Sequence, residues 1–330
     1  EDLLFRMQIA EVNGSDYLMF DSHHIVVDGL SMNVLFSEFI NIYNGQVLED
    51  KTIDFDDYVK WNTDSESQKI METDLDYWEK VFADGVEKTL IPTDFERNGE
   101  ISNEGETVHS SIEGELYEAI NGFCSKNSVT PFMLLMSAYG VLAYKLTLSK
   151  NIIIGVPTSG RFVEKTNNMV GMFVSSLPFV INVETGDKFI NLVNGVGDNL
   201  LEILQHQNCT MNQMAGRLDL SSENGQNPFF STMFGVNDVV NPENIDYELV
   251  EFEQNQAKFD ITFDVNREGD KWKIVLRYNR NLYKNESMQK FVDRYMQILK
   301  QVVVNPNMLV RDISILSDSE QNKLLFKNNN

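Results

Sequence analysis

The apolar positions in the first hundred residues predict one short strand followed by three helices. Residues 16–20, DYLMF, form an apolar run with strand character. Helical spacing follows at Met32, Leu35, Phe36, Phe39 and Tyr43. Asn44-Gly45 predicts the end of this helix, because both residues tolerate the left-handed conformation, and Asp28 or Ser31 is its expected N-cap. Residues 52–82 carry aromatic side chains among many charges and predict two amphipathic helices.

From residue 106 onward, strand patterns alternate with helical patterns. Strands are expected at 106–115, at the β-branched run 151–157, and at 173–183, with a hairpin over 259–279 that turns at residues 268–270. Helices are expected at 116–126, 131–148, 188–205 and 287–303. Strands interleaved with helices predict an α/β fold.

The pattern breaks at residues 90–100, where Pro92 and Gly99 lie in a polar stretch, and we expect a domain boundary there. The predicted units are residues 1–95, residues 96–316, and a polar tail at 317–330 that has the composition of a linker.

Composition and charge limit the partners of the chain. Its 330 residues are 42% hydrophobic and 23% charged, as in an ordinary globular protein, and its net charge is −23. So acidic a surface disfavours broad nucleic-acid contact and is repelled by anionic membranes. Cys124 and Cys209 are expected to be reduced thiols, and no signal-peptide pattern is present at the start, so a cytoplasmic location is expected.

The candidate chemistry lies in residues 22–31, SHHIVVDGLS. His23 and His24 precede three β-branched residues, which favour extended backbone over helix, so the segment is expected to be a strand end that runs into a loop. Successive side chains on extended backbone point to opposite sides, so one imidazole is expected to face the interior or a neighbouring element and the other a cleft. Histidine suits proton transfer or hydrogen bonding to a reacting amine, and Asp28 could orient an imidazole or pair with a cation. A purely structural reading, in which Asp28 caps the helix and both histidines pack, stays open.

Two other kinds of site find less support. A metal site would need a third ligand beside a His-x3-Asp pair, so none is expected. A serine nucleophile would need a Gly-x-Ser-x-Gly turn, which the chain lacks. We therefore expect any reaction here to move a group directly between two bound substrates.

The segment SHHIVVDGLS resembles the HHxxxDG motif of the condensation domains of nonribosomal peptide synthetases. Further resemblances follow in the order of that family: DFDDYVKW, GVPTSGR, MVGMFVSSLPFVI, NGQNPFFSTMF and KFDITFDV. The end, SILSDSEQNKLL, resembles the join to a following adenylation domain. The resemblance covers essentially the whole chain.

The resemblance implies a fold of two lobes, each like chloramphenicol acetyltransferase, that form a V with a central tunnel. Residues 1–95 would then be the remainder of the N-terminal lobe and 96–316 the C-terminal lobe. It also implies peptide-bond formation between a donor acyl or peptidyl thioester and an acceptor aminoacyl thioester. Upstream and downstream carrier proteins would deliver both on phosphopantetheine arms beside a neighbouring adenylation domain, so the chain itself would bind no cofactor.

The resemblance also assigns roles to single residues. His24 matches the second motif histidine, which faces the tunnel and positions or deprotonates the attacking amine, and His23 matches the mainly structural first histidine. Asp28 matches the motif aspartate, for which Arg161 is the expected partner. Gly29 matches the motif glycine beside the reacting groups. Ser175 and Ser176 stand where the family prefers Asn-Thr and are candidates for lining the tunnel.

Several alternatives remain at this stage. An epimerisation domain shares the HHxxxDG motif, and a coenzyme A-dependent acyltransferase shares the fold. A non-catalytic module that docks carrier proteins is the third alternative. Two family motifs that normally precede the histidines are absent, so the chain is expected to lack the first part of its N-terminal lobe and to be inactive alone.

Overall fold

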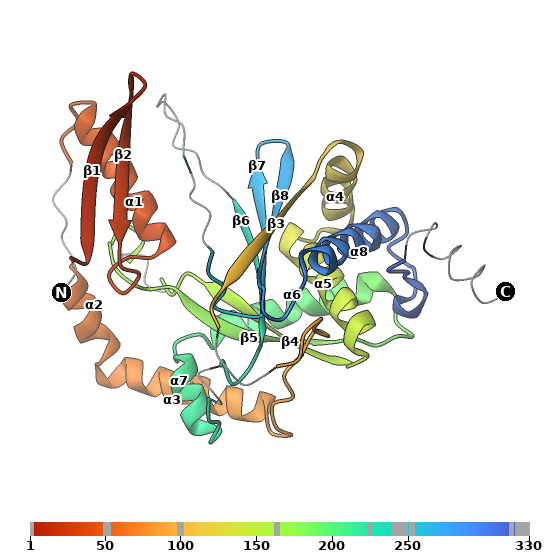
Figure 1. Ribbon diagram of the computed structural model, residues 1–330. Helices are drawn as coiled ribbons and strands as arrows, with labels where there is room; N and C mark the ends of the chain where they lie inside the picture. Colours follow the sequence, from red (N-terminus) through yellow and green to blue (C-terminus); the bar gives the residue numbers. More distant parts are fainter. Residues whose placement is uncertain are drawn as a thin grey trace.

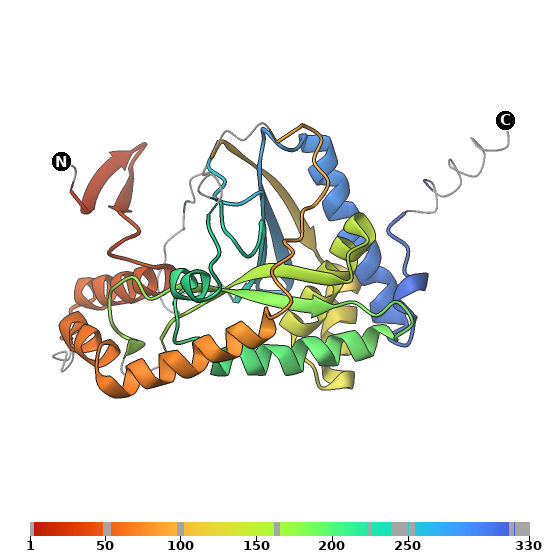
Figure 2. The ribbon, with the colours of Figure 1, turned by 90° about the horizontal axis from the view of Figure 1, so that it is seen from below.

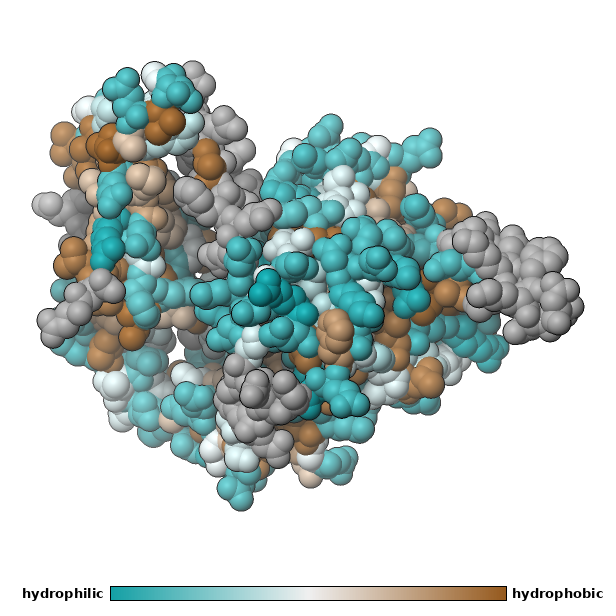
Figure 3. All heavy atoms as spheres, viewed as in Figure 1, coloured by the Kyte–Doolittle hydropathy of each residue, from teal (hydrophilic) through white to brown (hydrophobic). Residues whose placement is uncertain are grey.

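The structure is a computed structural model that describes residues 3–48, 54–97, 102–161, 166–222, 226–238, 250, 255–316 and 320. Two parts are visible in Figure 1: a hairpin with one helix, and a larger part built on a six-stranded sheet. The space-filling view shows a notch between them at the top of the molecule (Figure 3).

The smaller part consists of strands β1 (Phe5–Val12) and β2 (Ser15–Ser22) and helix α1 (Gly29–Tyr43). The strands pair antiparallel across Asn13-Gly14, and both turn residues have positive φ, as a tight hairpin turn requires. Phe20 of β2 packs edge-on against Phe36 of α1, with 4.7 Å between ring centroids. The predicted strand and helix are confirmed, whereas β1 was not predicted.

Helices α2 (Phe55–Asn62) and α3 (Ser65–Val81) confirm the two amphipathic helices predicted after α1. Figure 2 shows α3 leading away from the smaller part along the underside of the larger one. The Trp78 indole of α3 is buried there and donates to the carbonyl of His206 at 2.8 Å. The short helix α7 (Met211–Arg217) adds Arg217, which forms ion pairs with Glu72, Asp76 and Glu79 of α3.

The large sheet has the strand order β3-β8-β7-β6-β4-β5. Its members are β3 (Gly105–Ile112), β4 (Asn151–Thr158), β5 (Ser175–Asn182), β6 (Thr232–Asp238), β7 (Ile261–Glu268) and β8 (Lys271–Asn279). β6 runs parallel to both β4 and β7, and the other pairs are antiparallel, so the sheet is mixed. β5 lies at the edge, where Pro178 is tolerated because an edge strand needs fewer ladder donors.

Helices α4 (Gly114–Asn127), α5 (Pro131–Thr147), α6 (Phe189–Gln205) and α8 (Asn285–Val304) lie together against this sheet (Figure 1). The short 3₁₀ helix η3 (Val310–Asp312) follows them. Every residue of α5 from Leu134 to Ala143 is buried, so α5 is the centre of the hydrophobic core. The α/β prediction and its helices are confirmed.

One finding concerns membrane-spanning length. Within the described ranges no single helix is long and apolar enough to cross a membrane. Helices α4 and α5 reach the required length and apolar composition only when they are taken together, and the chain bends by 109° between them.

The division at residues 95 and 96 stays a prediction. Leu75 and Trp78, which lie on its N-terminal side, belong to the same hydrophobic core as the large sheet. The predicted tail at 317–330 lies outside the described residues, apart from Glu320.

Candidate active site

The histidine segment joins β2 to α1 through a turn. β2 ends at Ser22, the amide of His23 donates to the carbonyl of Leu4 at 2.8 Å, and the amide of Val26 donates back to the carbonyl of His23 at 3.1 Å. The prediction of a strand end that runs into a loop is therefore confirmed. Residues 24–26 turn instead of staying extended, because these hydrogen bonds override the β-branched preference of the segment. Both imidazoles are exposed, so the expectation that one faces the interior is wrong.

His24 has a defined hydrogen bond despite its exposure. Its Nδ1 lies 2.8 Å from the carbonyl oxygen of Val27. A carbonyl only accepts, so Nδ1 carries the proton in this bond and the neutral ring keeps its free lone pair on Nε2. That nitrogen is the one suited to accept a proton or a hydrogen bond from a substrate.

Asp28 is the N-cap of α1 and is only 2% exposed. Its Oδ1 accepts from both the amide and the hydroxyl of Ser31, each at 2.7 Å. Its Oδ2 accepts from the amides of Phe173 and Val174 at 3.0 and 3.2 Å. The carboxylate therefore joins the start of α1 to the segment just before β5, more than 140 positions later.

The partner expected for Asp28 lies beside it. Nη2 of Arg161 is 3.1 Å from Oδ1 of Asp28, and both side chains are 2% exposed. The same Nη2 donates to the Ser31 hydroxyl at 2.8 Å, and Nη1 donates to the carbonyls of Thr166 and Met169. The guanidinium also stacks on the Phe173 ring, 4.2 Å from its centroid. Both terminal nitrogens of the guanidinium are thus hydrogen-bonded, while Nε of Arg161 is buried without a partner among the described residues. The hydrogen bonds to the two terminal nitrogens offset part of the cost of removing this ion pair from water.

The network also sets the charge of Asp28. Burial alone would raise the pKa of this carboxyl, because it disfavours the charged form. The hydrogen bonds from Ser31, Phe173 and Arg161 act in the opposite direction, and together they hold the pKa of Asp28 below 3.8. Asp28 is therefore an anion at neutral pH, held in place rather than free to exchange a proton.

Gly29 and Gly160 lie beside these residues, but the fold requires glycine only at position 160. Gly160 precedes Arg161 with a φ of +63°, and a Cβ there would lie 1.8 Å from the carbonyl oxygen of Phe173. Gly29 has no atom within 4 Å of its Cβ position, so the fold does not require glycine there and the space in front of it is open. The role of Gly29 beside the reacting groups stays a prediction.

Because Gly160 directly precedes Arg161, replacing it tests whether the backbone at this position is needed for stability. Gly160→Ala is expected to cost more than about 1–2 kcal/mol of unfolding free energy, since it adds a steric clash to the left-handed strain. Urea unfolding of this variant measures the loss. Gly122→Ala is the control, because Gly122 lies in α4 with open space at its Cβ position. Equal unfolding midpoints for the two variants would contradict the prediction.

The remaining predicted residues lie at the edge of this arrangement. Ser175 and Ser176 begin β5, are half-buried, and pair in register with Thr158 and Pro157 of β4. They directly follow Val174, whose amide donates to Asp28, but none of the described contacts joins their side chains to Asp28 or Arg161. Their place in a tunnel stays a prediction. Among the described residues no group of three or more His, Cys, Asp or Glu could hold a metal ion.

Ser31 has a central place in the network that sequence reasoning missed. Its hydroxyl is buried between Asp28, Arg161 and the backbone of Gly171. It was recognised only as a possible N-cap. The backbone donors at Phe173 and Val174 and the acceptors at Thr166 and Met169 carry no side-chain signal that a sequence could show.

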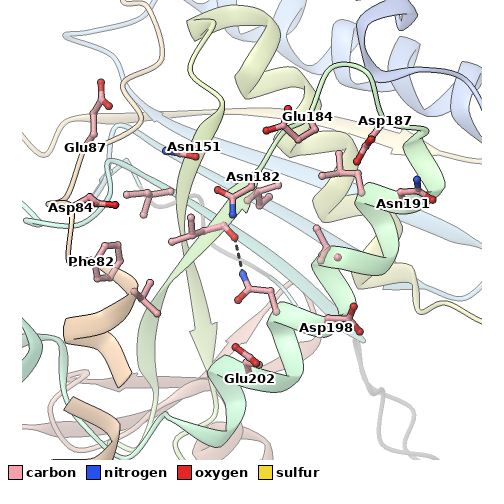
Figure 4. Close-up of a pocket in the computed structure, with 18 of the residues that line it drawn as sticks. Phe82, Asp84, Glu87, Asn151, Asn182, Glu184, Asp187, Asn191, Asp198 and Glu202 are labelled. Carbon is pink, nitrogen blue, oxygen red and sulfur yellow. Dashed lines mark hydrogen bonds between the residues drawn. The ribbon is translucent and has the colours of Figure 1, made fainter. Parts of the chain in front are cut away.

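A cavity away from the histidine segment lies between α6, β5 and the loop after α3 (Figure 4). Its volume is about 980 Å³, and its lining includes six carboxylates: Asp84, Glu87, Glu184, Asp187, Asp198 and Glu202. In Figure 4 these side chains lie around the opening, and Asn199 donates to the carbonyl of Val180 at 2.7 Å. His24, Asp28 and Arg161 do not line it, so it is separate from the candidate active site.

The α/β fold carries two exposed histidines on a turn that leads into a buried Asp–Arg pair, and Asp28 joins the start of α1 to the segment before β5. The family model for the condensation domain matches residues 1–325, and the chain belongs to that family.

Known synthetases and solved structures agree with this family. Gramicidin S synthase 2 of Aneurinibacillus migulanus is 29% identical over 98% of this chain, which corresponds to 7% of that protein. Bacitracin synthase 2 of Bacillus licheniformis is 30% identical over 99% of this chain and 13% of its own length. The chain thus spans a small fraction of these curated relatives.

Solved structures show the same fold. The condensation domain from Monacolin K polyketide synthase MokA superposes with a TM-score of 0.81 at 19% identity, covering 93% of this chain and 74% of that one. The X-domain from teicoplanin biosynthesis, in a complex with OxyB, gives a TM-score of 0.82 at 19% identity, covering 96% of this chain and 74% of that one.

Proposed function

We propose that this chain catalyses peptide-bond formation between a donor acyl or peptidyl thioester and an acceptor aminoacyl thioester, each carried on a carrier protein by a phosphopantetheine arm. The observation that carries the proposal is the exposed ring of His24, which lies four positions before the buried Asp28–Arg161 pair. The hydrogen bond between Nδ1 and the carbonyl of Val27 can hold the imidazole in one orientation, and the pair anchors the start of α1 that follows.

In the proposed step the acceptor amine attacks the carbonyl carbon of the donor thioester. A C–N bond forms, the C–S bond breaks, and the thiol of the donor arm leaves. The amine loses one proton and the departing sulfur gains one, so no oxidant or metal is needed. Nε2 of His24 would accept the hydrogen bond that orients the amine or would take its proton, and Gly29 would leave room beside it.

The proposed partners are an upstream donor carrier protein, a downstream acceptor carrier protein and a neighbouring adenylation domain. The proposal is supported by the length of the relatives, of which this chain covers only 7% and 13%, and by the likeness of its fold to part of a four-domain nonribosomal peptide synthetase. A net charge of −23 gives no long-range attraction for acidic carriers, so docking would rely on local patches. The cytoplasmic location stays a prediction.

Transfer between two loaded carriers tests the function. The natural polypeptide that contains residues 1–330 is mixed with an aminoacyl donor carrier and an aminoacyl acceptor carrier, and the acceptor is analysed by mass spectrometry. We expect a dipeptidyl thioester on the acceptor carrier. Running residues 1–330 alone in parallel tests the expectation that they are inactive by themselves.

The same assay separates the alternatives. Transfer from acyl-coenzyme A but not from carrier thioesters would support a coenzyme A-dependent acyltransferase. Inversion of the α-carbon of a single carrier-bound residue, without a new bond, would support an epimerisation domain. Carrier binding with no product would support a docking module, a possibility raised by the structurally similar X-domain in its complex with OxyB.

A further inference from the structure

Two aromatic side chains of α2 pack on the ring that carries the Arg161 guanidinium. That ring is Phe173, which is buried, and the guanidinium carbon lies 4.2 Å from its centroid. Phe55 and Tyr58 of α2 both contact it at an interplanar angle of 67°, with their centroids 5.5 and 4.8 Å from that of Phe173. Burial raises the pKa of the Tyr58 hydroxyl, and the positive charge of Arg161 acts in the opposite direction, as expected of groups that lie close together. Aromatic pairs of this geometry are stabilising, so α2 helps to hold Phe173 in place.

Phe55 also packs on the backbone that binds Ser31. A Cβ at Gly171 would lie 2.5 Å from the Phe55 ring, so the ring rests directly on the main chain there. Both the amide and the carbonyl of Gly171 are hydrogen-bonded to the Ser31 hydroxyl, at 3.1 and 2.8 Å. That hydroxyl in turn donates to Asp28 at 2.7 Å. The aromatic face of α2 therefore lies against the segment that holds the Asp28 carboxylate.

A continuous series of contacts leads from Phe173 to His24. The amide of Phe173 donates to Oδ2 of Asp28 at 3.0 Å. One peptide bond joins Asp28 to Val27, which is 6% exposed and whose carbonyl oxygen lies 2.8 Å from Nδ1 of His24. The described residues offer the exposed His24 ring no second hydrogen bond. Its orientation therefore depends on where the Val27 carbonyl is held.

We propose that Phe55 and Tyr58 of α2 are positioning residues for His24. Their rings hold Phe173 where its amide reaches Asp28, and this fixes the start of α1 together with the turn that precedes it. The inference rests on the proposed transfer function, in which His24 orients the attacking amine or takes its proton. In this role the two rings act through His24 and need no contact with the substrate.

Transfer between loaded carriers by the natural polypeptide tests the role of Tyr58. Tyr58→Leu removes the ring but keeps an apolar side chain. We expect the rate at saturating acceptor carrier to fall about tenfold or more, with an unchanged KM for that carrier, because a displaced imidazole affects the reaction step rather than docking. Tyr58→Phe should restore the rate, since the described contacts of Tyr58 are made by its ring. A normal rate in a folded Tyr58→Leu variant, or a rise in KM alone, would overturn the proposal.

Two further variants of α2 support this comparison. Val59→Ala is the matched control, because Val59 follows Tyr58 in the same helix, is 45% exposed and carries no ring. An equal loss of rate in Val59→Ala would overturn the proposal. Phe55→Leu gives a second measurement should Tyr58→Leu fail to fold, since the Phe55 side chain is 40% exposed. It is expected to lower the rate in the same way, and a normal rate would count against the proposal.

A double-mutant cycle separates positioning of His24 from a general loss of structure. In a His24→Ala background, Tyr58→Leu should lower the transfer rate little further, because the side chain that it positions is already absent. The full tenfold loss in that background would show that Tyr58 acts elsewhere and would overturn the proposal.

The environment of the His24 ring gives a readout that does not need transfer. In residues 1–330 isotopically labelled at Cε1 of histidine, we expect Tyr58→Leu to shift or broaden the NMR signal of His24. The signal of His109 should stay unchanged, because His109 is exposed on β3. An unchanged His24 signal would overturn the proposal. Absence of transfer by the unmodified natural polypeptide would instead contradict the proposed function, so the two failures are distinguishable.

Discussion

Replacing His24 by alanine is expected to lower the rate of dipeptidyl thioester formation by about 10²–10⁴-fold, the range typical of a lost proton-transfer group. The imidazole is exposed and its hydrogen bond to Val27 is local, so the variant should keep its fold. Single-turnover transfer between loaded carriers measures the rate, and circular dichroism checks the fold.

Two further histidines supply the controls for that experiment. His109→Ala should leave the rate unchanged, because His109 is exposed on β3, at the edge of the sheet opposite β5. His23→Ala should have a smaller effect than His24→Ala, since Nδ1 of His23 only accepts from the amide of Ile25 in the turn. A folded His24→Ala variant with the normal rate would remove His24 from the mechanism.

His24→Gln separates the two roles considered for this residue. Glutamine can still accept a hydrogen bond from an amine, but it cannot take up a proton at neutral pH. A variant that keeps most of the rate would show that His24 positions the amine. A loss as large as that of His24→Ala, together with a changed pH profile of transfer, would show that it accepts the proton.

The helices and most strands of the large part could be predicted because their patterns are local. The spacing of apolar residues gave α1, α3 and α8, and the β-branched run gave β4. α7 was missed because it has only seven residues, although its capping box of Thr210 and Gln213 was a usable signal. β1 was missed although Phe5, Met7 and Ile9 alternate with polar residues as in a strand.

The site was predictable only in part, for a physical reason. The roles of Asp28 and Arg161 could be expected from their motifs, since a buried carboxylate needs a cation. The turn at residues 24–26 could not be predicted from side-chain preference, because backbone hydrogen bonds from His23 to Leu4 and from Val26 to His23 accompany it. The donors to Oδ2 of Asp28 are backbone amides of a segment about 145 positions away, and amides are present in nearly every residue.

Asp28→Ala is expected to lower the free energy of unfolding by about 3–5 kcal/mol, because it leaves the buried guanidinium of Arg161 without its counter-ion. The same change removes the N-cap of α1 and leaves the amides of Phe173 and Val174 without an acceptor. Urea unfolding measures the loss. Asp28→Asn, which keeps an acceptor oxygen but not the charge, should lie between the alanine variant and the unmodified protein.

Asp64→Ala is the matched control, since Asp64 caps α3 through the same kind of backbone hydrogen bonds but is exposed and has no buried cation beside it. Its loss of unfolding free energy should be much smaller, and equal losses in the two variants would contradict the importance of the Arg161 pair.

The pH dependence of the stability gives a second measurement of the Asp28 network. The folded pKa of Asp28 lies below the unfolded value of about 3.8, so its stabilisation is complete above that pH and is lost as the pH falls through the folded pKa. The unmodified protein should therefore lose stability more steeply below pH 3.8 than Asp28→Ala, in which this titration is absent.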